Sequence, residues 1–149
     1  MPKHIHTEDI MVTRIESAAG HDQDRARHAA LLRSAREQTE AEQAWCYLQA
    51  AHIVGQQAFK PHLETHARML ALACRTRDWG EAAGQGLRLL LVPLGHLTGR
   101  LPLGNPGRAT VSAVTPLPVP VALQTLIDAA GPACEQSGQT ESGQIGPTP

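Results

Sequence analysis

Two histidines, His62 and His66, stand four residues apart in a stretch whose pattern predicts a helix. At this spacing both imidazoles lie on one helix face, where they can bind the same metal ion. His52 lies in the preceding predicted helix, and helix axes about 8–10 Å apart would bring it close enough to be a third ligand. Three neutral imidazoles suit zinc, copper, nickel or iron, and His96 or a water molecule could complete the shell. The predicted metal ligands are therefore His52, His62, His66 and His96.

The same histidines also have an interpretation without a metal. They could lie at the edge of a helical core and form hydrogen bonds with backbone carbonyls at helix ends. The His-x-x-x-His spacing is common by chance, and Glu64 is predicted to point away from both histidines, unlike the glutamate of a zincin helix. Both interpretations stay open at the level of the sequence.

A separate metal site is conceivable at the N-terminus, where Pro2-Lys3-His4 follows Met1. If Met1 is removed, the free amine, two deprotonated amides and the third-position imidazole could bind Cu(II) or Ni(II) in a square plane. The alternative is a polar arm without structure, and the sequence does not decide between the two.

Four helices are predicted to position the histidines. Apolar residues recur at helical spacing from about residue 24 to residue 98, and glycine, proline and cap residues separate the segments. Thr39 with Glu42, and Asp78 with Glu81, have the spacing of capping boxes. The predicted helices run from Asp24 to Arg36, from Glu40 to Val54, from about Pro61 to Arg75, and from Asp78 to a kink or end at Pro93.

Short connections between these helices favour an all-α, four-helix up-down bundle of two helical hairpins, with tetratricopeptide-like pairing as an option. In that topology five of the eight histidines map to one end of the bundle. They are His28, His52, His62, His66 and His96.

The flanking segments have a different character. Residues 1–22 lack sustained periodicity and are expected to form a flexible N-terminal arm. Prolines after Gly99 predict an extended strap, followed by a short helix from Val121 to Ala130. The helical domain with its strap would therefore span residues 23–130. Residues 131–149 are rich in Gly, Ser, Gln, Thr and Pro, a composition typical of a disordered tail.

The composition excludes several classes of protein. The net charge of −1 argues against nucleic-acid or anionic-membrane partners, which require a basic surface. The most apolar run, Leu87 to Leu97, is about eleven residues long and too short to span a membrane. No signal peptide is recognisable at the N-terminus, so a cytoplasmic location is expected. No phosphate loop or catalytic triad can be placed, which makes an enzyme the least supported class. Trp45 and Trp79 are expected to pack in the core.

Four motifs occur in order along the chain. They are Ala51-His-Ile-Val-Gly-Gln, Pro61-His-Leu-Glu-Thr-His-Ala-Arg-Met-Leu, Arg77-Asp-Trp and Gly99-Arg-Leu-Pro-Leu-Gly-Asn. With these motifs the chain resembles the bacterial family named domain of unknown function 3703, over about residues 24–128. The resemblance implies a small helical protein without a settled activity, in a family sometimes encountered among metal-resistance genes. Relatives commonly continue Gly-Asn-Thr-Gly-Gly where this chain has Gly104-Asn-Pro-Gly-Arg.

Two functional hypotheses follow. The first is a non-enzymatic protein that binds Zn, Cu or Ni through the histidine cluster. The second is a helical-hairpin module that binds a protein partner or forms a homodimer. Small residues that would let helices nest support the second hypothesis, and these include Ala51, Gly84 and Gly86 beside Trp45.

Overall fold

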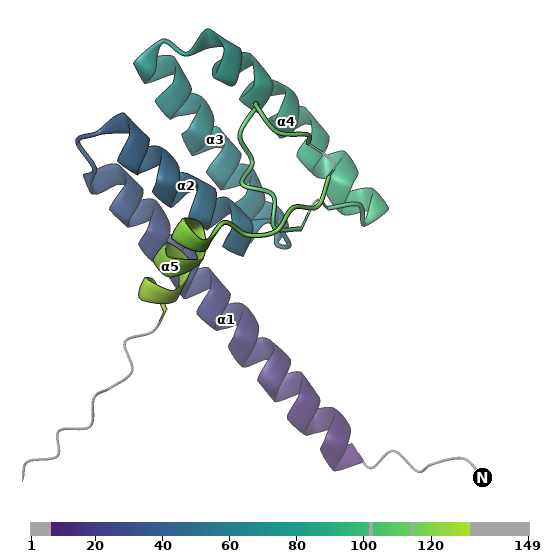
Figure 1. Cartoon of the computed structure of the whole chain (residues 1–149). Helices are drawn as coiled ribbons and strands as arrows, with labels where there is room; N and C mark the ends of the chain where they lie inside the picture. Colours follow the sequence, from purple (N-terminus) through teal and green to yellow (C-terminus); the bar gives the residue numbers. More distant parts are fainter. Residues whose placement is uncertain (1–6, 102, 114, 132–149) are drawn as a thin grey trace, which may run out of the picture.

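The computed structural model describes residues 7–101, 103–113 and 115–131. In this part of the chain there are five α-helices and no strand, which confirms the all-α prediction of four helices followed by a short C-terminal helix (Figure 1). The elements are α1 (Thr7–Glu37), α2 (Ala41–Gly55), α3 (Phe59–Thr76), α4 (Trp79–Thr98) and α5 (Val121–Ala129).

The helices form two hairpins that pack against each other. Helix α1 pairs with α2, α3 pairs with α4, and α2 packs on α3 to join the hairpins (Figure 1). Small residues in α2 and α3 allow this approach, since Ala50, Ala51 and Ala73 are fully buried. Helix α5 lies against α2 and α1. The largest buried apolar side chains include Leu31, Trp45, Leu48, Met69 and Leu72.

Helix α1 begins at Thr7, well before the start predicted near Asp24. Its N-terminal half extends away from the bundle (Figure 1), and residues 17–26 are exposed to solvent. Since residues 17–26 bury no apolar stripe, the hydrophobic period that predicts amphipathic helices is absent from them. Residues 1–6 and 132–149, which contain Pro2-Lys3-His4 and most of the predicted tail, lie outside the described residues.

The helix caps only partly follow the predicted pattern. Asp78 caps α4, because its Oδ1 accepts a hydrogen bond from the backbone N–H of Glu81 at 3.0 Å. The predicted capping box at Thr39 is wrong. Helix α2 has Glu40 as its N-cap, and no side chain caps it. Thr39 therefore lies one residue too early to accept from the unpaired backbone N–H groups of the first helical turn.

Two other expectations about α4 are corrected. The helix continues through Pro93 to Thr98, so of the two predicted outcomes, a kink or an end, the end at the proline is wrong, and His96 lies within the helix. Trp79 is not a core residue, since 66% of it is exposed at the first position of the helix. No helix in the described residues combines the length and apolar character needed to cross a membrane.

The segment from residue 99 to residue 120, which we call the strap, runs beside α4 and then crosses the bundle to α5 (Figure 1). Gly84 of α4 makes room for it, because a Cβ there would overlap the side chain of Ala109. Within the strap, Gly104 and Gly107 have φ angles of 75° and 81°, which favour glycine. The strap thereby places Asn105 and Gly107 at the end of the bundle where α2 ends and α3 begins.

Candidate metal centre

Three of the predicted ligands converge between α2 and α3. The Nε2 atom of His66 lies 3.1 Å from Nε2 of His52 and 3.2 Å from Nε2 of His62. His52 stands in the last turn of α2, whereas His62 and His66 stand one turn apart near the start of α3. All three side chains are buried, and each offers a ligand nitrogen within 4.8 Å of the others. The short turn between the two helices is what brings His52 to this pair.

The outward-facing nitrogens of two of these histidines donate hydrogen bonds. Nδ1 of His52 lies 2.8 Å from the carbonyl oxygen of Asn105, which can only accept. Nδ1 of His66 lies 2.7 Å from Oε1 of Gln85. The amide nitrogen of Gln85 donates to Glu81 Oε1 and to the carbonyl of Gly107, so its oxygen must face His66 and accept. Both histidines therefore carry their proton on Nδ1, and in the neutral ring their Nε2 lone pairs face each other.

His96 lies behind His62. Its Nε2 is 3.1 Å from Nδ1 of His62, on the opposite side of that ring from the other two histidines. When Nδ1 of His62 donates its proton to His96, Nε2 of His62 presents a lone pair toward His66. His96 is only half-buried and stacks edge-on against Phe59. The structure thus brings His96 to the cluster as a neighbour of His62, and direct coordination by His96 stays a prediction.

Burial keeps the clustered imidazoles neutral. Desolvation is the largest cause that lowers the pKa of His62 to about 3 and the pKa of His66 to about 4. Desolvation also lowers the pKa of His52 well below its ordinary value, and the neighbouring histidines lower it further. Neutral imidazole is the form that binds metal ions.

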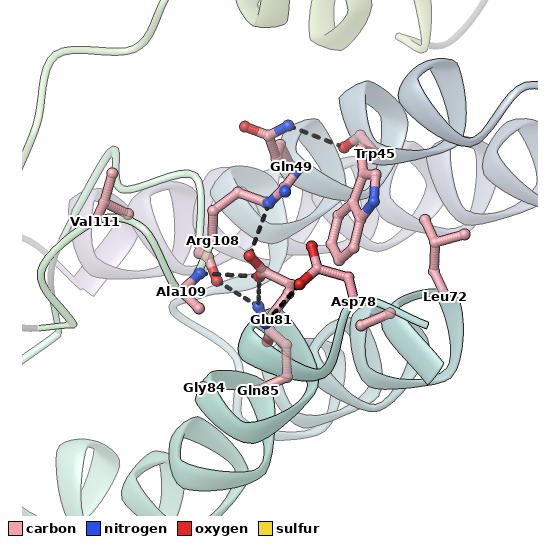
Figure 2. A network of polar contacts seen from close by, with 12 residues as sticks. Trp45, Gln49, Leu72, Asp78, Glu81, Gly84, Gln85, Arg108, Ala109 and Val111 are labelled. Atoms are coloured by element: carbon pink, nitrogen blue, oxygen red, sulfur yellow. Dashed lines mark hydrogen bonds and ion pairs between the residues drawn. The ribbon is translucent and has the colours of Figure 1, made fainter. Parts of the chain in front are cut away.

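A buried carboxylate, Glu81, fixes the residues behind His66 (Figure 2). Its Oε1 accepts hydrogen bonds from Gln85 Nε2 at 2.7 Å and from the backbone N–H of Ala109 at 2.8 Å. Its Oε2 accepts from Arg108 Nε at 3.1 Å, and the Arg108 guanidinium stacks 4.0 Å above the Trp45 ring. This network joins α4, the strap and α2, and it holds the Gln85 amide in one orientation.

Sequence reasoning missed three residues that orient the cluster: Glu81, Gln85 and Asn105. Glu81 was interpreted only as a cap residue, although Gln85 follows it at the i,i+4 spacing of interacting helical side chains. Asn105 organises the strap, since its Nδ2 donates to the carbonyls of Ser112 and Thr115 and its Oδ1 accepts from Gly107 N. The turn residues around Asn105 were the available signal, but they could not indicate that its carbonyl meets His52.

His28 does not join the cluster. Its Nε2 lies 2.8 Å from the hydroxyl of Thr65, which itself donates to the carbonyl of Pro61. His28 therefore donates to Thr65 and ties α1 to α3. Gly55 is required beside it, because a Cβ at that position would overlap the His28 ring. Of the five histidines predicted at this end of the bundle, His28 has a structural partner of its own.

A cavity of about 260 Å³ opens beside His52, His62 and His66. Its walls come from the second half of α4 and from the strap. The cluster is therefore buried within the protein but borders a space that a small molecule could occupy.

No curated protein and no solved structure shows a significant match to this chain. A family model described as "Protein of unknown function (DUF3703)" matches residues 22–127. This range contains α2, α3, α4 and the second half of α1, and it agrees with the family that the sequence motifs indicate. The chain belongs to the DUF3703 family.

Proposed function

We propose that the protein binds one transition-metal ion, such as Zn, Cu or Ni, through Nε2 of His52, His62 and His66. The observation that carries the proposal is the contact between His52 and His66. Their Nε2 atoms are 3.1 Å apart, and both Nδ1 protons are committed to carbonyl oxygens on the outside. Two lone pairs at this distance repel each other, whereas a cation between them is coordinated by both.

The spacing fits a metal ion. With metal–nitrogen distances of about 2.0–2.1 Å, two ligand nitrogens lie about 2.9 Å apart at a right angle and about 3.3 Å apart at the tetrahedral angle. Two of the three separations, 3.1 and 3.2 Å, fall between these limits, and the third, between His52 and His62, is at most 4.8 Å. The outer hydrogen bonds also match those usually found around metal-bound histidines, where a carbonyl or a similar acceptor fixes the tautomer of each ring.

The alternative without a metal explains less of the geometry. Core histidines that merely close a helix end pair a donor with an acceptor, as His28 does with Thr65. The contact between His52 and His66 has no such pairing, because each ring donates in the other direction. A metal ion accounts for all of these contacts at once.

The test is metal analysis of untagged protein after incubation with Zn, Cu or Ni and removal of excess ion. We expect one ion per chain in the wild type and less than about one tenth of that in a His62→Gln/His66→Gln variant. A His21→Gln variant serves as the control, because His21 is exposed on α1 and is not one of the three clustered histidines. Circular dichroism establishes that each variant is folded. A folded wild-type protein that stays empty with all three ions would refute the proposal.

A second candidate function, binding of a protein partner or a second copy of the chain, is favoured by exposed leucines along α4. Four leucines at 3-4-3 spacing are 55% to 85% exposed there: Leu87, Leu90, Leu94 and Leu97. Gly84 and Gly86 do not serve to let two helices nest. Gly84 accommodates Ala109 of the strap, and a Cβ added at Gly86 would meet no atom within 4 Å. The measurement is the molar mass in solution, where a dimer should dissociate in a Leu90→Lys/Leu97→Lys variant.

A further inference from the structure

The cavity beside the histidine cluster has apolar walls. Besides the three histidines, it is lined by aliphatic side chains from two parts of the chain, namely Leu91, Val92 and Leu94 of α4, and Leu101 and Ala113 of the strap. Its volume of about 260 Å³ exceeds the ~150 Å³ of an apolar cavity that holds benzene. An occupant with a compact apolar body and a few additional atoms therefore fits this space.

The charged residues that line the cavity are both cations. They are Arg88 and Arg100, and no acidic residue is among the lining residues. Arg88 is 7% exposed, and its NH2 group donates to the backbone carbonyls of Arg108 and Val111, which are neutral acceptors. The nearby carboxylate of Glu81 forms its ion pair with Arg108 instead. A divalent metal ion on three neutral imidazoles would add to the positive charge beside the cavity, where Glu81 interacts with Arg88 without forming an ion pair.

Three protein ligands leave a metal ion with at least one open coordination position, as in catalytic and ligand-binding zinc sites. Because the same histidines line the cavity, an open position would face it. We propose that the cavity binds a small apolar monocarboxylate, with the size of benzoate or phenylacetate, whose carboxylate coordinates the metal ion. This inference rests on the metal site proposed above.

The carboxylate and the apolar body of such a ligand interact with different features of the site. The carboxylate offsets the charge of the metal ion and of the buried Arg88, whereas a neutral apolar molecule would offset neither. The apolar body covers the leucine, valine and alanine walls, which a small hydrophilic anion such as acetate would leave in contact with water. An oxygen donor is also an ordinary ligand for zinc beside imidazoles.

The experiment uses the full chain loaded with Co(II), whose visible spectrum reports changes of coordination. Metal content is measured first, then benzoate, acetate and benzamide are titrated separately. We expect benzoate to change the cobalt bands with a dissociation constant at least about 10-fold below that of acetate, and benzamide to cause no change at equal concentrations. Equal affinity for benzoate and acetate, or no spectral response to benzoate, would overturn the inference.

The two proposals fail in distinguishable ways. A chain that takes up no cobalt, zinc, copper or nickel contradicts the metal site itself. A chain that binds cobalt at one ion per molecule but shows no preference for benzoate contradicts only the ligand class.

A matched pair of variants locates the ligand. Leu94 lines the cavity, whereas Leu90 lies one turn earlier on α4, is 77% exposed and is not among the lining residues. A Leu94→Asp substitution should weaken benzoate binding at least about 10-fold, because it places a carboxylate beside the bound anion. A Leu90→Asp substitution adds the same charge elsewhere and should change the affinity less than about 2-fold. Both variants should retain cobalt, and equal effects of the two substitutions would contradict binding in the cavity.

Discussion

His66 is held in one orientation by Gln85, whose Oε1 lies 2.7 Å from Nδ1 of the imidazole. Gln85 is fully buried, and its amide nitrogen is used by Glu81 and by the carbonyl of Gly107. The amide cannot rotate without breaking these bonds. His66 therefore presents Nε2 to the cluster, and the strap contributes to this orientation through Gly107.

Replacement of Gln85 by leucine should weaken metal binding. The variant removes the acceptor that fixes the His66 tautomer, and loss of such an outer partner costs about 10–100-fold in metal affinity. Competition with a chelator of known affinity measures the change. Gln49→Leu is the control, because Gln49 donates to the Trp45 carbonyl within α2 and not to one of the clustered histidines. An unchanged affinity in a folded Gln85→Leu protein would show that this hydrogen bond does not orient a ligand.

Replacement of Glu81 by glutamine should destabilise the whole fold. Glu81 is buried and its partner Arg108 is 21% exposed, so the variant leaves a largely desolvated cation without its counterion. A loss of about 3 kcal/mol in the free energy of unfolding is expected. Denaturant unfolding measures it, beside a Glu64→Gln control. Glu64 pairs with Arg68 on the surface, where the loss should stay below about 1 kcal/mol. Similar losses in the free energy of unfolding for the two substitutions would contradict a stabilising role for the buried Glu81–Arg108 ion pair.

The metal-free protein should lose stability as the pH falls below 6.5. The pKa values of His62 and His66 lie at about 3 and about 4 in the folded chain, against 6.5 for an ordinary histidine. Between these values the unfolded chain binds more protons than the folded one, so acid favours unfolding, by at most about 1.4 kcal/mol per pH unit for each histidine. Thermal unfolding as a function of pH checks this. The slope should be smaller in the His62→Gln/His66→Gln protein, and an equal slope would speak against buried neutral imidazoles.

Gly107→Ala should disturb the cluster from the strap side. Gly107 has a φ angle of 81°, and a Cβ there would lie 2.8 Å from the His52 ring. The variant must therefore displace His52 or the strap, and we expect at least about 10-fold weaker metal binding together with a lower melting temperature. Gly86→Ala is the control. It has open space around it, and alanine should stabilise the helix by about 0.5–1 kcal/mol. An unchanged metal affinity in the Gly107→Ala protein would mean that the strap does not support the site.

The meeting of His52, His62 and His66 was predictable because it depends on local features. Helical spacing places His62 and His66 on one face, and a short turn brings the end of α2 beside the start of α3. Apolar periodicity and small residues also predict the order of the helices and their pairing. Each of these patterns involves residues that are close together in the sequence, so it can be recognised without knowledge of the tertiary structure.

The outer partners of the histidines could not be predicted in the same way. Asn105 meets His52 through a backbone carbonyl, and a backbone group carries no trace in the sequence. Gln85 depends on a carboxylate below it and a strap carbonyl beside it, which only the folded chain assembles. The start of α1 was misplaced for a different reason, because exposed helical turns lack the apolar pattern that marks a packed helix.

The hydrogen bond between His52 and Asn105 joins residues 53 positions apart, and it closes the longest loop among the described hydrogen bonds of the clustered histidines. Closure of so long a loop is entropically late, whereas the hairpin of α2 and α3 needs only a short turn. In a folding chain the three imidazoles would therefore come together before the strap docks and supports them. Metal affinity should then rise in two kinetic stages, with weak capture by the hairpin first and tight retention only once the strap has docked.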